Sequence, residues 1–481
     1  MFRFALIVLF FSSFSIANEY QEWLKSQNTQ YSNYKKSLDE EFSNMLKKDW
    51  EEFKTLSTPS PYKKPKPVVI PSIKKVVKIP AVEIKKSPTV AIPKIKKISI
   101  PKPQKVVKKV LKKEKIVKDF YTTQFDFYSV PISIQYDKKT FFTKNTINKN
   151  TISEFWDMIS NTNYKKLIKQ IKATAGNLKL NDWAKYQFIH KLGLNIFKQD
   201  NNKANLFTWF ILIKMNYDVK VGYNTKHIYL MSTMQHSLYQ VSFFTLKKKK
   251  YYILTPNGKV GNIGSIYTYA GDYPKATNKL SFAIFDEIQL YNHLKNKTLS
   301  FEYNGKQHAI DAQYSSDLID FYKTFPQSDY NIYFNTKNST LLSNSMLVKL
   351  APLVKGKSEI EAVNLLLRFV QTSFKYKTDQ KQFDYEKVMF PEETINYPYS
   401  DCEDRSIMFS YLVKNLLKLH VIGIQYKDHI ATAVSFSSKV SGANFKYRGK
   451  VYTISDPTYI KANAGMVMPQ YKNSKFKVIS L

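Results

Sequence analysis

The sequence predicts an α+β protein in which helices precede antiparallel strands. Runs such as DWAKYQFIHKLGLNIF place apolar residues at helical spacing, whereas short runs such as YYILT are rich in aromatic and β-branched residues. The order helix, loop, helix, strands occurs once before residue 275 and again after residue 346. A helix and a Lys/Pro-rich segment come before both blocks.

The first 17 residues have the features of an export signal. Arg3 precedes a mostly apolar stretch that ends in Ser15-Ile16-Ala17, with small residues at the −3 and −1 positions of a cleavage site. This predicts a signal peptide over residues 1–17 cleaved after Ala17, with an uncleaved anchor as the alternative. No cysteine follows the site, which excludes a bacterial lipoprotein, and no later apolar run approaches ~18 residues. We expect a protein of the periplasm or cell envelope, or a secreted one, without a transmembrane segment after signal cleavage.

Residues 18–54 are predicted to form one amphipathic helix. Its apolar residues recur at helical spacing, with Glu and Lys on the other faces. These residues are Tyr20, Trp23, Tyr31, Tyr34, Leu38, Phe42, Met45 and Phe53. We expect this stripe to pack on a partner helix or on the body of the protein rather than on lipid.

Residues 55–118 are predicted to be a disordered, extended linker. They contain 19 lysines against two glutamates, and ten of the 19 prolines of the chain. Proline breaks helices and like charges repel, so the segment should be stiff and extended. It is either a spacer attracted to an anionic envelope surface or a solvated tether without a partner.

The net charge of +36 does not indicate a nucleic-acid-binding protein. Roughly half of the excess lies in the linker, and the whole chain has only four arginines. Base readout relies on arginine, and an exported protein rarely meets nucleic acid.

The globular part divides into three predicted regions. Residues 119–275 form a first domain, residues 276–345 a β-rich connection with a hairpin at Asn304-Gly305, and residues 346–481 a last domain. Helices are expected at 182–197, 205–215, 359–374 and 402–417. Strands are expected at 218–223, 227–231, 239–244, 251–255, 419–425, 429–436 and 450–455.

The first and last domains resemble an internal repeat. IKMNYDVKVGYNTKHIYLM can be laid on NLLKLHVIGIQYKDHIATAV, which places His227 opposite His429. YYILTPN then falls on VYTISDPTY, with Thr255 where the second copy has Asp456. The first copy has no cysteine, so it would be a degenerate copy that serves as scaffold or binding surface. The alternative is chance alignment of ordinary α+β patterns.

Cys402 is the only cysteine of the chain. Ser400-Asp401-Cys402-Glu403 fits a capping box with Ser400 as N-cap and Glu403 at N3, which places the thiol in the first turn of a helix. Free N–H groups and the helix dipole there stabilise a thiolate and could bind an oxyanion. Asp401, Glu403 and Asp404 oppose this if they point at the sulfur, and Arg405 is available to pair with one of them.

His429 opens the apolar strand IATAVSF, and Asp456 follows the strand VYTIS. Together with Cys402 they supply a nucleophile, its general base and the carboxylate that orients the imidazole. His420 is the rival base, although its place within LHVIGI favours packing. The alternative for Cys402 is a small buried hydrophobe. In an oxidising compartment structural thiols pair, so a solitary cysteine favours a reactive thiol.

These residues resemble the transglutaminase-like cysteine enzymes of the papain-like clan. Asp-Cys-Glu-Asp-Arg-Ser, then His-Ile-Ala-Thr-Ala-Val, then Ser-Asp-Pro-Thr-Tyr is similar to the Cys, His and Asp motifs of that family in the same order, and LLLRFVQTSFKYKTD resembles its preceding helix. The matching part covers roughly Glu359 to Gly465. The chain departs from the common pattern where the family often has Gly before the cysteine and Trp upstream. By analogy, Gln371 is a candidate oxyanion donor, with a helix-surface glutamine as the alternative.

The resemblance implies a papain-like core with Cys402 as nucleophile, His429 as base and Asp456 as orienter. The expected function is an exported cysteine protease or amidase, or an acyltransferase, that acts on a protein or peptide through a thioacyl intermediate. Hydrolysis is favoured because nothing specifies an amine acceptor. No cofactor is predicted, although some exported relatives use calcium and acids flank the cysteine. The alternative function is a non-catalytic cell-envelope adaptor tethered by the basic linker.

Overall fold

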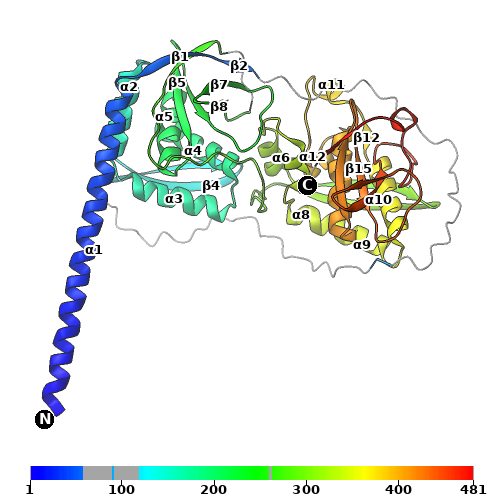
Figure 1. Cartoon of the computed structure of the whole chain (residues 1–481), viewed down its shortest axis with the longest axis horizontal. Coiled ribbons are helices and arrows are strands. Elements are labelled where there is room, and N and C mark those ends of the chain that lie inside the picture. The colour runs from blue at the N-terminus through cyan, green and yellow to red at the C-terminus, as the bar shows by residue number, and fades with distance from the viewer. Residues whose placement is uncertain (1, 58–88, 91–118, 259–262, 480–481) are drawn as a thin grey trace.

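The computed structural model describes residues 2–57, 89–90, 119–258 and 263–479 (Figure 1). The protein is α+β with antiparallel sheets, which confirms the predicted class. The predicted linker lies outside the described residues except at its first three residues and at Thr89 and Val90. Thr89 forms an antiparallel bridge with Ser358, and the Val90 N–H donates to Lys357 O at 3.0 Å.

Helix α1 (Phe2–Leu46) projects from the body of the protein, and only its C-terminal part packs (Figure 1). Phe42 is buried against Trp156, with ring centroids 4.6 Å apart, and Lys214 pairs with Asp39. Tyr20, Trp23 and Tyr34 are exposed, so the N-terminal part of the predicted stripe does not pack on the body.

The predicted helix 18–54 is wrong at its end, where β1 (Trp50–Lys54) forms a strand on β9 (Ser265–Tyr269). None of the helices in the described part of the chain is both long enough and apolar enough to cross a membrane.

The first globular part begins with elements that the sequence analysis did not predict. They are the hairpin β3 (Phe120–Phe127) and β4 (Val130–Asp137), and helices α2 (Lys149–Ser160) and α3 (Tyr164–Asn177). The expected helices then follow as α4 (Asp182–Ile196) and α5 (Asn201–Lys214). Nine of the 15 residues of α4 and ten of the 14 residues of α5 are buried. The buried residues of α5 run without a break from Ala204 to Ile213, as expected of a core helix that is apolar on all faces.

The first sheet has the strand order β1-β9-β5-β6-β8-β7-β2. Its remaining strands are β2 (Leu56–Ser57), β5 (Val219–Tyr223), β6 (Ile228–Ser232), β7 (Ser242–Leu246) and β8 (Lys249–Leu254). Only Thr55 separates β1 from β2, yet they pair with opposite edges of the sheet. The seven strands therefore curl into a nearly closed barrel.

The connecting region has about as many residues in helices as in strands, so the description β-rich fits only its first part. The hairpin of β10 (Leu294–Tyr303) and β11 (Lys306–Ser315) is present as predicted. Both turn residues, Asn304 and Gly305, have positive φ, as the type I′ pair requires. Helices α6 (Ser316–Tyr322), α7 (Tyr330–Asn335) and α8 (Thr340–Leu342) follow, with a π-helical segment, η1 (Ser343–Leu347), after them.

The last part contains the other two predicted helices, α10 (Glu359–Ser373) and α13 (Cys402–Leu412), the second extended by a π-helical turn η2 (Val413–Leu417). It also contains three short helices that the sequence analysis did not predict, α9 (Val348–Val354), α11 (Asp379–Gln382) and α12 (Pro391–Asn396). A short parallel pair joins β12 (Lys375–Tyr376) to β13 (Tyr399–Ser400).

The five-stranded sheet of this part has the order β16-β17-β15-β14-β18. Its strands are β14 (His420–Gln425), β15 (Ile430–Ser435), β16 (Asn444–Tyr447), β17 (Lys450–Ser455) and β18 (Lys477–Ile479).

The two sheets share one topology. The comparison is between strands β5–β9 of the first sheet and strands β14–β18 of the second. When each set is numbered from one to five along the chain, both sheets have the spatial order fifth, first, second, fourth, third, and every neighbouring pair is antiparallel. In each copy a buried helix directly precedes the first strand, α5 in one and α13 with η2 in the other. This shared order is what the repeat predicts.

Candidate active site

Cys402 is the first residue of α13, and every residue of this helix is buried. The helix begins at Cys402 as expected, but its N-cap is Asp401 rather than the predicted Ser400. Ser400 belongs to β13, whose pairing with β12 holds it in extended conformation. The Asp401 N–H donates to Asp404 Oδ2 at 3.1 Å, so Asp404 and not Glu403 fills the N3 position.

His429 and Asp456 form a direct pair. His429 ends the turn between β14 and β15, closed by a hydrogen bond from Tyr426 N–H to His429 O at 2.8 Å. Asp456 follows β17, and its Oδ1 accepts the N–H groups of Thr458 and Tyr459 at 2.8 and 3.3 Å. Oδ2 is left to contact His429 Nε2 at 2.8 Å. Both side chains are buried, and in the described structure His429 Nδ1 has no hydrogen-bond partner.

The structure brings Cys402 to the strand end that carries His429. Its Sγ accepts a hydrogen bond from Ile430 N–H, the residue after His429, at 3.4 Å. The thiol itself donates to Glu403 Oε2 at 3.1 Å. Among the described residues no hydrogen bond joins the thiol to His429. The three predicted residues therefore lie at one place, with the thiol turned to a carboxylate.

The electrostatics oppose a thiolate in this conformation. Burial, then the charges of Glu403 and Asp401, raise the pKa of the Cys402 thiol well above its usual value, and the Ile430 N–H opposes them. The expectation that the helix N-terminus stabilises a thiolate is therefore wrong for this conformation. Arg405 does not neutralise the acids by a salt bridge within the described structure. Instead its guanidinium donates to Phe374 O and Ser400 Oγ.

Three buried carboxylates beside the thiol could hold a cation. One oxygen each of Asp379, Asp401 and Glu403 lies within 4.8 Å of the others. In the described structure both carboxylate oxygens of Asp401 and Oδ1 of Asp379 have no hydrogen-bond partner. Burial and the neighbouring carboxylates raise the pKa of Asp379 and Asp401 well above the usual value. Hard cations such as calcium bind carboxylate oxygens, and the unpartnered oxygens of Asp401 and Asp379 could serve as such ligands.

Comparisons of the chain with protein-family models, curated proteins and solved structures found no match. The site is therefore interpreted from its own geometry.

Two other candidate residues lie elsewhere than predicted. Gln371 is buried rather than on a helix surface, and its Nε2 donates to Asp456 O at 3.2 Å and Ala462 O at 3.0 Å. Both amide hydrogens are thus engaged, so Gln371 fastens the loop after Asp456 and is not an oxyanion donor here. His420 is exposed, not packed, and pairs with Ser435 at the far end of the strands from His429. This position excludes it as the base.

The first globular part has a side-chain hydrogen bond like one beside the thiol, but it has no cysteine. Asn205 Nδ2 donates to Ile228 O at 2.7 Å, as Ser406 Oγ donates to Ile430 O at 3.2 Å. Gln187 Nε2 donates to Pro256 O at 2.7 Å, one residue after Thr255, whereas Gln371 donates to the carbonyl of Asp456 itself, the residue aligned with Thr255. His227, however, is exposed.

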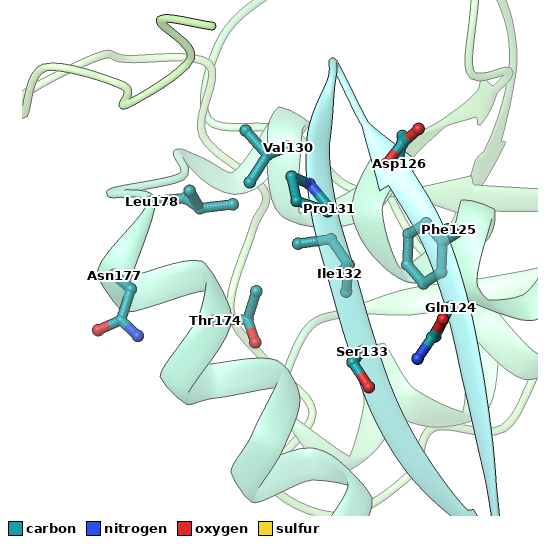
Figure 2. Close-up of a pocket in the computed structure, with 10 residues that line it drawn as sticks. All are labelled: Gln124, Phe125, Asp126, Val130, Pro131, Ile132, Ser133, Thr174, Asn177 and Leu178. Atoms are coloured by element: carbon teal, nitrogen blue, oxygen red, sulfur yellow. The ribbon is translucent and has the colours of Figure 1, made fainter. Parts of the chain in front are cut away.

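Cavities of the first copy lie away from the thiol. A groove of about 640 Å³ runs between the β3–β4 hairpin and α3, with Val130, Ile132 and Leu178 among its apolar residues (Figure 2). A second, of about 830 Å³, lies beside His190. Cys402 lines neither of them.

The sequence analysis missed three residues of the site. Asp379 is far from the Cys motif in sequence, and no spacing signals its approach. Tyr426 and Tyr471 pack beside His429, with nearly parallel rings at centroid distances of 6.2 and 5.1 Å. The only available signal was the position of Tyr426 in the turn that carries the histidine.

Proposed function

We propose that this protein is an exported cysteine amide hydrolase, a protease or amidase, that acts on a protein or peptide. The observation that carries the proposal is the buried His429–Asp456 pair at 2.8 Å, with Cys402 hydrogen-bonded to the residue after the histidine. His429 Nδ1 is buried and, in the described structure, has no hydrogen-bond partner, so it remains open for a thiol proton. A buried imidazole held by a carboxylate on one nitrogen and open on the other is suited to general-base catalysis.

The proposed reaction uses these groups in sequence. Cys402 Sγ attacks the amide carbonyl carbon while His429 Nδ1 takes the thiol proton, giving a tetrahedral intermediate. The C–N bond then breaks as His429 returns that proton to the leaving amine. Water attacks the thioester, His429 accepts its proton, and the carboxylic acid leaves as the thiol is restored. Asp456 holds the Nε2–H tautomer throughout. An amine in place of water would give acyl transfer.

The thiol must turn from Glu403 to His429 before this reaction begins. In the conformation described, the thiol donates to Glu403 Oε2 and its pKa is raised. A calcium ion held by Asp379, Asp401 and Glu403 would supply positive charge that offsets these carboxylates.

We further propose that the last part of the chain has a transglutaminase-like, papain-like core, and that the first part is its degenerate copy. The shared strand order of the two sheets supports this proposal. So do the matching side-chain hydrogen bonds to Ile228 O and Ile430 O. The order Cys, His, Asp along the last part is that of the family motifs.

The test is the pH dependence of iodoacetamide labelling of Cys402, with calcium and with a chelator. In wild type we expect labelling with calcium to persist well below the free-thiol pKa of about 8.5 and to collapse in His429→Ala. His420→Ala is the matched control, because that histidine lies at the other end of the same strands, and it should label like wild type. Equal labelling rates in wild type and His429→Ala, both with calcium and with the chelator, would contradict the enzyme proposal.

The export proposal has a separate test. Residues 2–17 form the first part of α1, and their role as a cleaved signal rests on the sequence alone. The mature protein should begin at Asn18 and fractionate with the periplasm or cell envelope. Recovery from the cytoplasm with an intact N-terminus would overturn it.

A non-catalytic envelope adaptor is the second candidate. Two observations favour it: the thiol is buried, and the projecting part of α1 exposes Tyr20, Trp23 and Tyr34. An adaptor requires no Cys–His coupling, so the labelling experiment separates the two functions.

A further inference from the structure

A tyrosine from the C-terminal end of the chain covers the catalytic histidine. The Tyr471 ring is nearly parallel to the His429 imidazole, at 10° and a centroid distance of 5.1 Å, and it also stacks on Tyr426 at 4.7 Å. Its hydroxyl hydrogen-bonds to Oδ1 of Asp428, which immediately precedes His429, at 3.1 Å. Cys402 and Asp456 are both close enough for their charges to contribute, after burial and Asp428, to the raised pKa of the Tyr471 phenol.

Tyr471 belongs to a closing segment, residues 466–476, that has little regular structure. Its only helical element is η3 (Pro469–Tyr471). Met468 and Tyr471 point inward and are buried, whereas Pro469, Gln470 and Lys472 are exposed. Through Tyr471 the segment covers His429, and Cys402, His429 and Asp456 are each only 3% exposed.

Backbone hydrogen bonds to the rest of the protein hold the closing segment at its two ends but not between them. Gly465 before it donates its N–H to Ile454 O at 2.7 Å, and β18 after it pairs with β14. Between these ends the backbone hydrogen bonds in the structure are local, such as Tyr471 N–H to Met468 O and Ser474 N–H to Tyr471 O. Side chains therefore hold the segment to the body, and segments of this kind open at low free-energy cost.

We propose that the closing segment is a lid over Cys402, latched by the Tyr471–Asp428 hydrogen bond, that must open before a substrate can reach the thiol. In the closed state the Tyr471 ring also fixes the plane of the His429 imidazole. This inference deepens the proposed function, because a lid regulates access only if Cys402 is the nucleophile. A thiol with 3% exposure cannot be approached by a peptide carbonyl without such a movement.

The experiment measures the rate of iodoacetamide alkylation of Cys402 in the full chain at one fixed pH. Tyr471→Phe keeps the stacked ring and removes only the latch, a hydrogen bond to a charged group, so we expect alkylation to be about tenfold faster. Tyr471→Ala should be faster still. Tyr452→Phe is the matched control, because Tyr452 is buried in the same apolar cluster and no ring contact or hydrogen bond to His429 is seen. Its rate should equal that of wild type.

Each outcome bears on the lid separately from the enzyme proposal. Wild-type rates in both Tyr471 variants would overturn the lid. Faster hydrogen exchange across residues 466–476 in Tyr471→Phe would support it. Adding His429→Ala to Tyr471→Phe distinguishes the two claims: a fast rate that no longer depends on His429 at any pH leaves the lid in place and removes the Cys–His pair.

Discussion

Replacing Glu392 by glutamine should change how the stability of the protein depends on pH. Glu392 lies in α12, is completely buried, and accepts the Ser339 N–H at 2.8 Å through Oε1. In the described structure its Oε2 has no hydrogen-bond partner. Burial, with a further contribution from Glu287, raises the pKa of Glu392 from 4.5 to about 7. Glutamine keeps the Ser339 contact and has no proton to bind.

The raised pKa of Glu392 fixes the sign and the size of the change in unfolding free energy with pH. Because the folded state holds the proton more tightly, this contribution to stability is fully present below pH 4.5 and is lost as the pH rises through 7. At about 1.36 kcal/mol per pH unit, the loss amounts to about 3 kcal/mol. The free energy of unfolding of Glu392→Gln, relative to wild type, should therefore rise by that amount between pH 4.5 and 8.

Urea unfolding at several pH values, followed by circular dichroism and tryptophan fluorescence, measures this difference. Glu302→Gln is the control, because it makes the same substitution at an exposed glutamate. A flat or falling difference for Glu392→Gln would refute the reasoning, since it would mean that the buried carboxyl ionises as easily in the folded as in the unfolded chain.

Three other predictions concern buried polar groups. Calcium should raise the melting temperature of wild type, because it would bind the folded state alone, and Asp401→Asn should reduce that increase; no increase with wild type would exclude the site. Gln371→Leu should lower the free energy of unfolding by about 1–3 kcal/mol, because it leaves the buried Asp456 and Ala462 carbonyls without this donor. Urea unfolding at pH 7 measures the difference. Unchanged stability would contradict the role of Gln371 in holding the loop after Asp456. Burial lowers the pKa of His190 from 6.5 to about 4, so its contribution to stability is present above pH 6.5 and lost as the pH falls through 4. Unfolding of His190→Phe should lack that acid-side loss, which is about 3 kcal/mol in wild type.

Local signals in the sequence sufficed where neighbours along the chain decide the structure. Asn304-Gly305 forms its hairpin because both residues accept positive φ. The strand after His429 and the strand before Asp456 follow from short apolar runs, so their ends, and with them the two side chains, could be placed without knowledge of the tertiary fold.

Other features depend on distant parts of the chain. Trp50–Lys54 continues a helical pattern but forms a strand, because β9, more than 200 residues later, offers a free edge. Ser400 and Asp401 are both good N-caps, and the choice is decided by the pairing of β13 with β12. The state of the thiol depends on the direction of the Glu403 side chain, which no pattern in the sequence encodes.

The position of β1 and β2 makes the first barrel dependent on one short stretch of chain. Residues 50–57 supply both outer strands of the first sheet, β1 and β2, and so cover the edges of β9 and β7 at once. Cutting the chain just after Ser57 would leave this closure intact, but removing the stretch would expose the backbone groups of β9 and β7 together. Unpaired edges recruit strands from other molecules. A truncated protein that starts after Ser57 should therefore self-associate through its first half, even though its thiol site is untouched.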